Sequence, residues 1–422
     1  MFTADLKGFP LGQAPLSRAG VAAQGWRVLH GDLPLPLAVL KDSALSHNLA
    51  WMQRFCDKRG ISLAPHGKTT LSPELWQRQL DAGAWGISLA TLFQVGLGVQ
   101  TGVARIIVPN QVVQWAELDA LALLQRQSPQ TQIWFLVDSI AQVDHIEAWA
   151  ADRGFAGQLP VLLEVGIDGQ RTGVRTADQA LALGQRIARS PVLALHGVEC
   201  YEGGLASCQH DSDRAGATAL MDRVDAVARA GAAQGWFSGP EILITAGGSA
   251  IFDLVAERLT PDLGASVPVR GVLRSGCYLT HDHQRYARYL CCVAQRLQLT
   301  ETLKPALEVW AAVQSCPEPG LALLTMGRRD VSYDLDLPLP LWRANGQGGA
   351  PQPVPAHWRI DALNDQHAYL RYDPAAPDRE HPRLAELVGS GISHPCTTFD
   401  KWRWMPVVDD GYRVVDAVSI WL

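Results

Sequence analysis

The sequence predicts an α/β protein in which a (β/α)8 barrel is followed by a mostly antiparallel β domain. Its 422 residues exceed the length of an ordinary single core, so two domains are expected. Up to about residue 268, short runs rich in Val, Ile and Leu alternate with helical patterns, as in a parallel sheet covered on both faces. Beyond that point helical patterns become scarce and shorter alternating runs take their place.

Eight apolar runs are candidates for the barrel strands, and a helical pattern follows each of them. The runs are residues 37–40, 61–65, 86–90, 105–109, 133–138, 160–165, 195–201 and 241–245. The first helix begins behind Asp42 or Ser43 as a cap, and Ser72-Pro-Glu74 opens the second with proline in its first turn. The later helices centre on residues 93–97, 118–124, 142–151, 177–188 and 224–233.

The remaining apolar runs are expected to be strands of the β domain. They are residues 269–273, 289–294, 306–313, 321–325, 368–372 and 412–418. Cys291 and Cys292 would then face opposite sides of a strand as inert core residues. We therefore expect a barrel over residues 37–268 and a β domain over residues 269–422, with residues 1–36 pairing with the β domain.

Composition excludes several classes of function. The net charge is −6 and there is no basic block, which argues against a nucleic-acid partner. The eight cysteines show no framework spacing, so they are expected to be reduced thiols in the cytoplasm. No stretch of about 18 apolar residues occurs, and the start lacks the pattern of a signal peptide, so no membrane span or secretion is expected.

Lys68 follows the second apolar run, after the sequence Pro65-His-Gly. It should lie just past the end of a buried strand and before a helix. In a barrel of alternating strands and helices, catalytic groups gather at that rim. A solvated loop lysine is the alternative, because most lysines are exposed. What favours a reactive role is that other functional side chains occur at matching strand ends.

Candidate anion-binding groups follow three other strands. Arg171 lies in the glycine-rich segment after strand six, where it could hold an oxygen anion, although a structural turn fits equally well. Thr245-Ala-Gly-Gly248-Ser249 follows strand eight, a usual phosphate site in barrels, where amides and a hydroxyl can bind phosphate. Gly276, in Arg274-Ser-Gly-Cys-Tyr278, could bring further amides to the same phosphate.

His394 and Cys396 lie two residues apart in a segment that reads as extended, so their side chains should point the same way. Imidazole and thiolate together favour zinc. Two ligands make a weak motif, and a buried histidine beside a buried cysteine is also an ordinary feature of a core. The pairs Cys208/His210 and His281/His283 are expected to be loop residues.

The motifs at 65–69, 245–249, 274–278 and 393–402 together resemble the D-serine dehydratase and D-threonine aldolase group. This group belongs to the alanine-racemase-like pyridoxal-phosphate enzymes. The resemblance covers nearly the whole chain in the right order. The closing segment His-Pro-Cys-Thr-Thr-Phe-Asp-Lys-Trp402 is its most specific part and is similar to the dehydratases, since the aldolases usually carry an acidic residue where Cys396 stands.

The resemblance implies a role for each motif. Lys68 would bind pyridoxal phosphate covalently and act as the general base. The turn with Gly248 and Ser249, together with the backbone of Gly276 and Cys277, would hold the phosphate.

The resemblance also implies the groups around the cofactor ring. Arg171 would approach the phenolic oxygen of pyridoxal phosphate, and Tyr201 would lie beside the pyridine ring. His394 and Cys396 would bind zinc near the substrate hydroxyl. The resemblance further implies a homodimer in which the partner subunit closes each site.

These roles predict dehydration and deamination of a small D-3-hydroxy amino acid, such as D-serine, to a 2-keto acid and ammonia. The loop 199–204 departs from the turn that dehydratases commonly show there, and it faces the substrate. A D-threonine aldolase, a D-3-hydroxyaspartate dehydratase or a racemase on the same scaffold therefore stays open, as does a noncatalytic pyridoxal-phosphate-binding protein.

Overall fold

Eight parallel strands form the barrel in the computed structural model, which describes residues 1–421. Their order around the sheet is β2-β9-β8-β7-β6-β5-β4-β3. The strands are β2 Ser62–Leu63, β3 Ile87–Ser88, β4 Arg105–Gln111, β5 Gln132–Val137, β6 Leu159–Val165, β7 Leu193–Cys200, β8 Ile242–Ala246 and β9 Val269–Leu273. Between β2 and β3 the Ser88 amide donates to the Pro65 carbonyl at 2.9 Å and the Trp85 amide to the Leu63 carbonyl at 2.7 Å, which closes the barrel.

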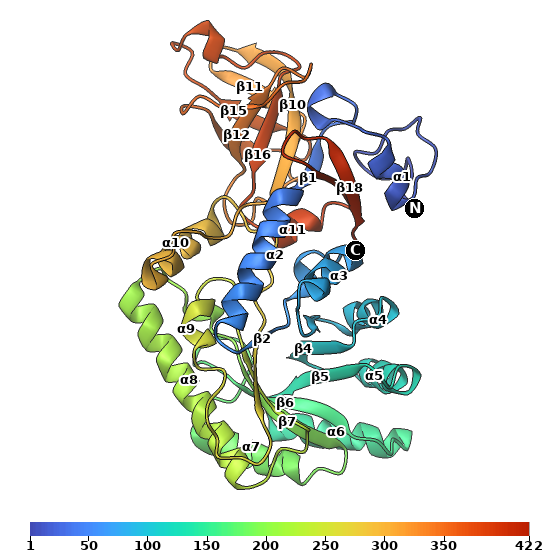
Figure 1. The fold of residues 1–422 in the computed structure, drawn as a ribbon, viewed down its shortest axis with the longest axis vertical. Helices are drawn as coiled ribbons and strands as arrows, with labels where there is room; N and C mark the ends of the chain where they lie inside the picture. Colours follow the sequence, from blue (N-terminus) through green and yellow to red (C-terminus); the bar gives the residue numbers. More distant parts are fainter. Residues whose placement is uncertain (422) are drawn as a thin grey trace.

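Helices cover the outside of the barrel (Figure 1). They are α2 Asp42–Asp57, α3 Pro73–Asp81, α4 Leu92–Gln100, α5 Trp115–Gln127, α6 Ile140–Arg153, α7 Ala177–Ala188, α8 His210–Ala233 and α9 Phe252–Ala256. Short 3-10 turns, η2 Gly67–Thr69 and η3 Gly203–Leu205, follow β2 and β7 at the mouth of the barrel. Helix α3 begins as expected, with Ser72 at the N-cap position and a proline in the first turn, but the side chain of Ser72 makes no capping hydrogen bond. The barrel core consists of the Val, Ile and Leu side chains that the strands bury.

A second sheet of ten strands forms the β domain, which lies above the barrel in Figure 1. The main path runs β13-β12-β16-β10-β1-β17-β18, and β11, β15 and β14 continue from β10. Its strands are β1 Leu37–Lys41, β10 Leu307–Glu318, β11 Leu321–Leu324, β12 Leu339–Ala344, β13 Gln352–Pro353, β14 Arg359–Leu363, β15 Ala368–Arg371, β16 Leu387–Gly391, β17 Trp404–Val408 and β18 Val414–Ser419. Pairing is antiparallel except between β1 and β17. The predicted fold class is confirmed by this arrangement.

Two strand assignments made from the sequence are wrong. β1 pairs with β10 and β17 in the β domain, although we expected it to open the barrel. The eighth barrel strand is β9, which lies between β8 and β2, although residues 269–273 were assigned to the β domain. Both runs are short, mostly apolar and largely buried, and periodicity alone does not say which sheet such a strand joins.

Residues 289–294 are also wrongly assigned, because they lie in helix α10, Arg285–Leu297. Leu290 and Val293 form the buried side of this helix. Cys291 is exposed and Cys292 is half-buried, so neither is the inert core residue that we expected. In an apolar run of only six residues, periodicity does not distinguish a strand from a helix, which explains the error.

The N-terminal segment packs against the β domain. The Val28 amide donates to the Tyr412 carbonyl at 3.0 Å, and the Val414 amide donates to the Trp26 carbonyl at 2.8 Å. These bonds place helix α1, Arg18–Ala23, beside β18, and the two ends of the chain lie on the same side of the molecule (Figure 1). The remaining short elements are η1 Val28–His30, η4 Asp378–Glu380 and α11 Pro395–Phe399.

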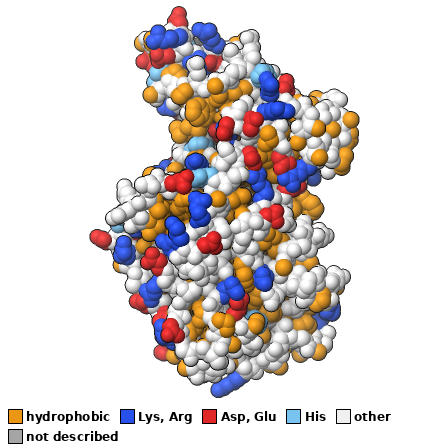
Figure 2. Space-filling view, in the orientation of Figure 1, with side chains coloured by type: hydrophobic (Ala, Val, Ile, Leu, Met, Phe, Trp, Pro, Cys, Tyr) orange, Lys and Arg blue, Asp and Glu red, His pale blue; other side chains and the backbone are white. Residues whose placement is uncertain are grey.

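Charged side chains of both signs are interspersed on the face shown in Figure 2. A surface that binds nucleic acid would carry a basic patch or stripe, and this face shows none. Within residues 1–421, no helix is both long enough and apolar enough to cross a membrane.

Candidate active site

One pocket of about 160 Å³ at the mouth of the barrel is lined by all nine site residues that the sequence predicted. They are Lys68, Arg171, Tyr201, Gly248, Ser249, Gly276, Cys277, His394 and Cys396. Seven come from segments that follow barrel strands, as active-site residues of barrels do. The other two come from the β domain, at the start of α11, so the pocket lies between the two domains.

Lys68 is exposed to the pocket from η2, the turn that follows β2. The turn is fixed from behind, because the indole of Trp76 donates to the Gly67 carbonyl at 3.1 Å. A Cβ at Gly67 would lie 2.7 Å from that indole nitrogen, so only glycine allows this contact. Burial, Lys68 and Arg274 together push the pKa of the neighbouring His66 well below its usual value.

Arg171 and Tyr201 form one wall of the pocket. The guanidinium of Arg171 lies 4.3 Å from the centroid of the Tyr201 ring, a cation–π contact. The loop that carries Arg171 is held by Arg175, which donates to the carbonyls of Thr172 and Gly173, each at 2.7 Å. A second hollow of about 210 Å³ lies against the same two side chains, so the pair separates two cavities.

The turn after β8 contains a glycine in the left-handed region, but its glycine amides are not open to a phosphate as the sequence suggested. Gly247 has a φ of +119°, a conformation that side chains other than glycine rarely adopt. The Glu202 carboxylate accepts hydrogen bonds from the amides of Gly247 at 3.0 Å and Gly248 at 2.5 Å. Burial raises the pKa of Glu202. Because Glu202 uses both amides, the next groups along the turn are the ones available to a ligand.

Those groups are Ser249 and the turn after β9. The hydroxyl of Ser249 accepts a hydrogen bond from the Cys277 amide at 3.2 Å. Gly276 lies against the backbone of His66, and a Cβ there would come within 2.6 Å of the His66 carbonyl oxygen. This close approach brings a hydroxyl and two backbone segments to one end of the pocket.

A buried ion pair joins the ends of the strands beneath the pocket. Arg274 pairs with Glu199, and it also donates to the Thr245 hydroxyl at 2.7 Å and to the Cys200 carbonyl at 3.0 Å. Burial raises the pKa of Glu199 to about 8, even though the Arg274 guanidinium opposes this shift. Removing Glu199 would leave the buried guanidinium of Arg274 without its carboxylate, and such a loss costs about 3–5 kcal/mol.

His394 and Cys396 lie at the opposite wall. The segment is not extended as expected, because Cys396 lies in the first turn of α11 while His394 precedes it. Both side chains nevertheless line the pocket. Nδ1 of His394 lies 2.6 Å from Oδ2 of Asp334, whose other oxygen accepts from the Thr397 hydroxyl at 2.8 Å. The ring is therefore fixed through Nδ1, which leaves Nε2 available to a ligand.

The thiol of Cys396 also contacts the barrel. Its Sγ lies 4.0 Å from Sγ of Cys277 and 3.5 Å from the hydroxyl of Thr69. Over residues 1–421, no three His, Cys, Asp or Glu side chains converge closely enough to hold a metal ion. A metal at this wall would thus be bound by two protein ligands and would keep open positions.

The sequence analysis missed other residues that contribute to this pocket or its walls, among them Thr69, Glu202, Tyr286 and Asp334. Thr69 directly follows the predicted lysine and could have been found by its position. Tyr286 lies in the first turn of α10, which we had not recognised as a helix. Asp334 precedes His394 by 60 residues in a loop without a pattern, so no sequence signal connects them.

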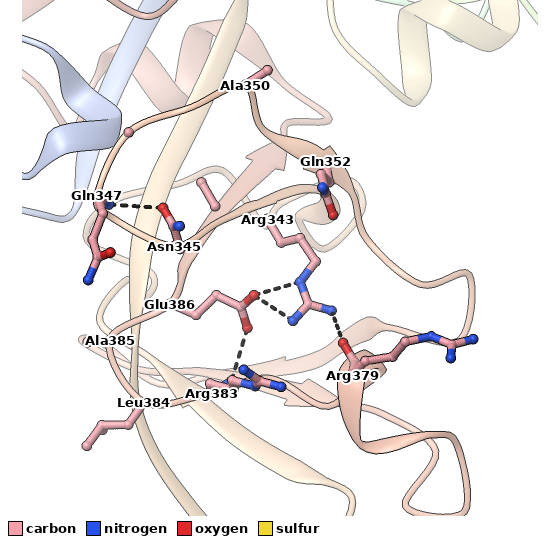
Figure 3. Close-up of a pocket in the computed structure, with 12 residues that line it drawn as sticks. Arg343, Asn345, Gln347, Ala350, Gln352, Arg379, Arg383, Leu384, Ala385 and Glu386 are labelled. Carbon is pink, nitrogen blue, oxygen red and sulfur yellow. Dashed lines mark hydrogen bonds and ion pairs between the residues drawn. The ribbon is translucent and has the colours of Figure 1, made fainter.

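A larger hollow, of about 520 Å³, lies in the β domain (Figure 3). Arg343 and Glu386 point toward each other there, and the guanidinium of Arg343 donates to Glu386 at 2.6 Å. It also donates to the Arg379 carbonyl at 3.1 Å. The lining contains no lysine, histidine or cysteine, and its carboxylate, Glu386, is paired with Arg343. We therefore take the pocket at the barrel mouth as the candidate active site.

Comparison with known proteins gives two family matches. Residues 40–260, more than half of the chain, match the model described as "Alanine racemase, N-terminal domain". Residues 306–408 match the model described as "Putative serine dehydratase domain". The two matches together cover most of the barrel and most of the β domain.

Individual relatives cover nearly the whole chain. A D-threonine aldolase from Arthrobacter sp. is 26% identical over 376 residues, which is 89% of each chain. The solved structure of a D-threonine aldolase from Filomicrobium marinum superposes with a TM-score of 0.76 at 23% identity, covering 96% of this chain and 98% of the other.

A dehydratase is similar as well. The D-threo-3-hydroxyaspartate dehydratase from Delftia sp. HT23 is 32% identical over 151 residues, which is 36% of this chain and 38% of the relative. Its solved structure has a TM-score of 0.72 at 23% identity and covers 94% of this chain and 99% of the other. A mutant of such a dehydratase is described in a metal-free form. At these identities, the structural likenesses show a shared fold.

Proposed function

The chain belongs to the alanine racemase N-terminal domain family, and from this premise we propose that it is a pyridoxal-phosphate-dependent lyase. The substrate would be a D-3-hydroxy amino acid similar to D-serine, and the products a 2-keto acid and ammonia. The observation that carries the proposal is that the amine of Lys68 shares one small pocket with the imidazole of His394 and the thiol of Cys396.

The pocket fits pyridoxal phosphate in its donor groups. Lys68 supplies an amine for the aldehyde, and Tyr201 supplies a ring face beside it. Ser249, Gly276 and Cys277 supply a hydroxyl and backbone groups at one end, where a phosphate needs hydrogen-bond donors. Nδ1 of His66, a residue that lines the pocket, is buried without a hydrogen-bond partner.

The wall opposite fits a divalent metal. His394 and Cys396 offer a nitrogen and a sulfur ligand of the kind that zinc prefers. Asp334 fixes the tautomer of His394 through Nδ1, an arrangement typical of histidines that bind metals. Two ligands leave positions for substrate and water, which catalysis requires.

The side chains of the pocket then have defined tasks. Pyridoxal phosphate, when bound, would supply an electron-withdrawing ring, and a metal held by His394 and Cys396 would supply a Lewis acid for the leaving hydroxyl. Lys68 takes the α-proton of the substrate as general base and holds it at Nζ. Arg171 and Tyr201 hold one wall of the pocket through their cation–π contact, and His394 and Cys396 would hold the metal.

An aldolase is the second candidate, and a specific observation favours it. The Arthrobacter sp. relative over most of the chain is a D-threonine aldolase. The presence of Cys396 supports the dehydratase instead, because the aldolases of the group usually carry an acidic residue there. A D-3-hydroxyaspartate dehydratase, a racemase and a noncatalytic carrier of pyridoxal phosphate are further outcomes that the products would reveal.

The deciding experiment is a product assay over a panel of D-amino acids with added pyridoxal phosphate, with and without a metal chelator. We expect keto acid and ammonia from D-serine or D-3-hydroxyaspartate, and loss of that activity with chelator. Glycine plus an aldehyde would select the aldolase, and the L-isomer without keto acid would select the racemase. A protein that binds the cofactor but turns over none of the panel would end the proposal.

We also propose a homodimer. Three large apolar side chains follow adjacent barrel strands at the mouth and are exposed: Phe93 by 64%, Val113 by 47% and Ile140 by 44%. Exposed apolar groups clustered at one end of a barrel favour contact with another protein surface. A Phe93→Glu variant should shift the mass measured by light scattering from dimer to monomer, and a wild-type protein that is monomeric would contradict the proposal.

The cytoplasm is the compartment that we propose. All eight cysteines are free thiols, which fits a reducing environment. Fractionation of cells that express the chain would test this, and recovery from a secreted or membrane fraction would contradict it.

A further inference from the structure

We propose that Cys277 and Cys396 form an oxidation site, at which hydrogen peroxide converts the two thiols into a reversible disulfide across the mouth of the barrel. The disulfide itself requires only the two thiols, whereas its effect on a bound metal rests on the proposed function. The two side chains come from different domains, so the bond would fasten α11 of the β domain to the turn after β9.

The geometry is that of a pair of thiols in contact. The two Sγ atoms lie 4.0 Å apart, and the hydroxyl of Thr69 lies 3.8 Å from Sγ of Cys277 and 3.5 Å from Sγ of Cys396. A disulfide requires a sulfur–sulfur distance of about 2 Å, so the two atoms must approach by about 2 Å in total. Cys396 lies in a helix of five residues, which can absorb such a shift more easily than a strand of the barrel.

The pair can be reached from solvent. Both side chains line the pocket of about 160 Å³, which also exposes Lys68, and a molecule as small as hydrogen peroxide can enter it. The other buried thiols differ in this respect. Cys56 and Cys200 are buried in the hydrophobic core, and neither lines the pocket.

The reaction balances with peroxide as the oxidant. The sulfur of one thiol attacks one oxygen of hydrogen peroxide, the O–O bond breaks, and a sulfenic acid and water result. The sulfur of the other thiol then attacks the sulfenic sulfur and expels a second water. Two thiols lose two electrons in total, and one peroxide becomes two water molecules. A dithiol reductant reverses the bond by thiol–disulfide exchange.

The disulfide competes with metal at Cys396. A disulfide sulfur is a poor metal ligand, because it cannot ionise and the thiolate is the form that binds metal. Oxidation would therefore remove one of the two ligands of the proposed metal. Conversely, zinc at about 100 times its dissociation constant leaves about 1% of the site free, which should slow disulfide formation about 100-fold.

The test uses the full chain with bound pyridoxal phosphate, after treatment with a chelator. The protein is exposed to hydrogen peroxide, its free thiols are blocked with N-ethylmaleimide, and the digest is analysed by mass spectrometry without reduction. We expect the Cys277–Cys396 peptide pair as the main new disulfide, lost on treatment with dithiothreitol and formed about 100-fold more slowly when saturating zinc is present.

Two variants make the assignment specific. Cys277→Ser should abolish the cross-linked peptide and leave Cys396 to proceed to the sulfinic acid. Cys292→Ser is the matched control, because Cys292 interacts with Cys208 on the surface of α10 and does not line the pocket. This control should form the Cys277–Cys396 bond as the wild type does.

The readout is the mapped peptide, so it is independent of whether the lyase assay succeeds. Recovery of both thiols in alkylated form after peroxide, or oxidation of Cys396 to sulfinic acid in the wild type while Cys277 stays alkylated, would overturn the proposal. A disulfide that joins Cys208 to Cys292 alone would overturn it as well.

Discussion

Nδ1 of His394 lies 2.6 Å from Oδ2 of Asp334, and this contact decides which nitrogen of the imidazole faces the pocket. The carboxylate is held in turn by the hydroxyl of Thr397 at 2.8 Å. Hydrogen bonds from His394 and Thr397 lower the pKa of Asp334, although burial, the largest single influence, acts in the opposite direction. The ionised carboxylate therefore keeps the proton on Nδ1 and directs the lone pair of Nε2 to the site of the proposed metal.

Asp334→Asn should weaken zinc binding about 10–100-fold, as loss of an outer carboxylate partner typically does. Zinc affinity can be measured by competition with a coloured chelator. Asp336→Asn is the control, because Asp336 pairs with Arg288 on the surface and does not contact His394. An unchanged affinity in Asp334→Asn would show that the contact does not serve a metal.

This contact also marks the limit of what the sequence could predict about the site. Lys68, Arg171 and Ser249 could be found because each follows a recognisable barrel strand, and parallel strands end at the same rim. Asp334 lies in a loop of the β domain that no periodicity describes. The fold brings it to His394 from 60 residues away, and nothing in the local sequence anticipates that approach.

Lys68→Ala should abolish the visible absorption of bound pyridoxal phosphate, because no other lysine lines the pocket to bind the aldehyde. The spectrum is recorded after removal of free cofactor by gel filtration. Lys58→Ala, at the end of α2, is the control and should keep the wild-type spectrum. If the Lys68 variant retained that absorption, the cofactor would be attached elsewhere and the proposed function would fail.

The contact between Arg171 and Tyr201 predicts a graded effect on cofactor affinity. Tyr201→Phe keeps the ring under the guanidinium and should change the dissociation constant of pyridoxal phosphate by less than about twofold. Tyr201→Ala removes the ring and opens the wall between two cavities, so we expect a loss of about 1 kcal/mol, roughly fivefold in affinity. The measurement is a titration of the cofactor-free protein, and equal affinities of the two variants would contradict the role of the stack.

The fold class could be predicted from the sequence, but the assignment of individual strands to the two sheets was less accurate. Alternation of apolar runs with helices identified the barrel, since this pattern depends on local periodicity. The swap of β1 for β9 could not be predicted, because both strands are short and mostly apolar, whichever sheet they join. Strand β1 pairs with β10 and β17, whose paired residues lie some 270 and 367 positions later in the sequence. Its place in the fold therefore depends on contacts that local sequence does not reveal.

His281 predicts how stability depends on pH. It lies in the turn between β9 and α10, with 4% of its surface exposed, and burial lowers its pKa to about 4. The unfolded chain has a histidine pKa of about 6.5. As the pH falls below that value, the unfolded state takes up a proton first, so the free energy of unfolding decreases until the pH reaches the folded pKa. The stability that comes from keeping His281 neutral is thus fully present at neutral pH and is lost as the pH falls toward about 4.

The variant His281→Asn removes this proton uptake while suiting the backbone, because His281 has a φ of +48° and asparagine tolerates that region. Between about pH 7.5 and about pH 5, the wild type should lose up to about 2 kcal/mol more of its free energy of unfolding than the variant does. Asp282, whose pKa burial raises to about 6, shifts stability in the opposite sense in both proteins, so it cancels in the comparison. Urea unfolding followed by tryptophan fluorescence gives the two differences, and parallel pH profiles would mean that His281 is not held neutral by burial.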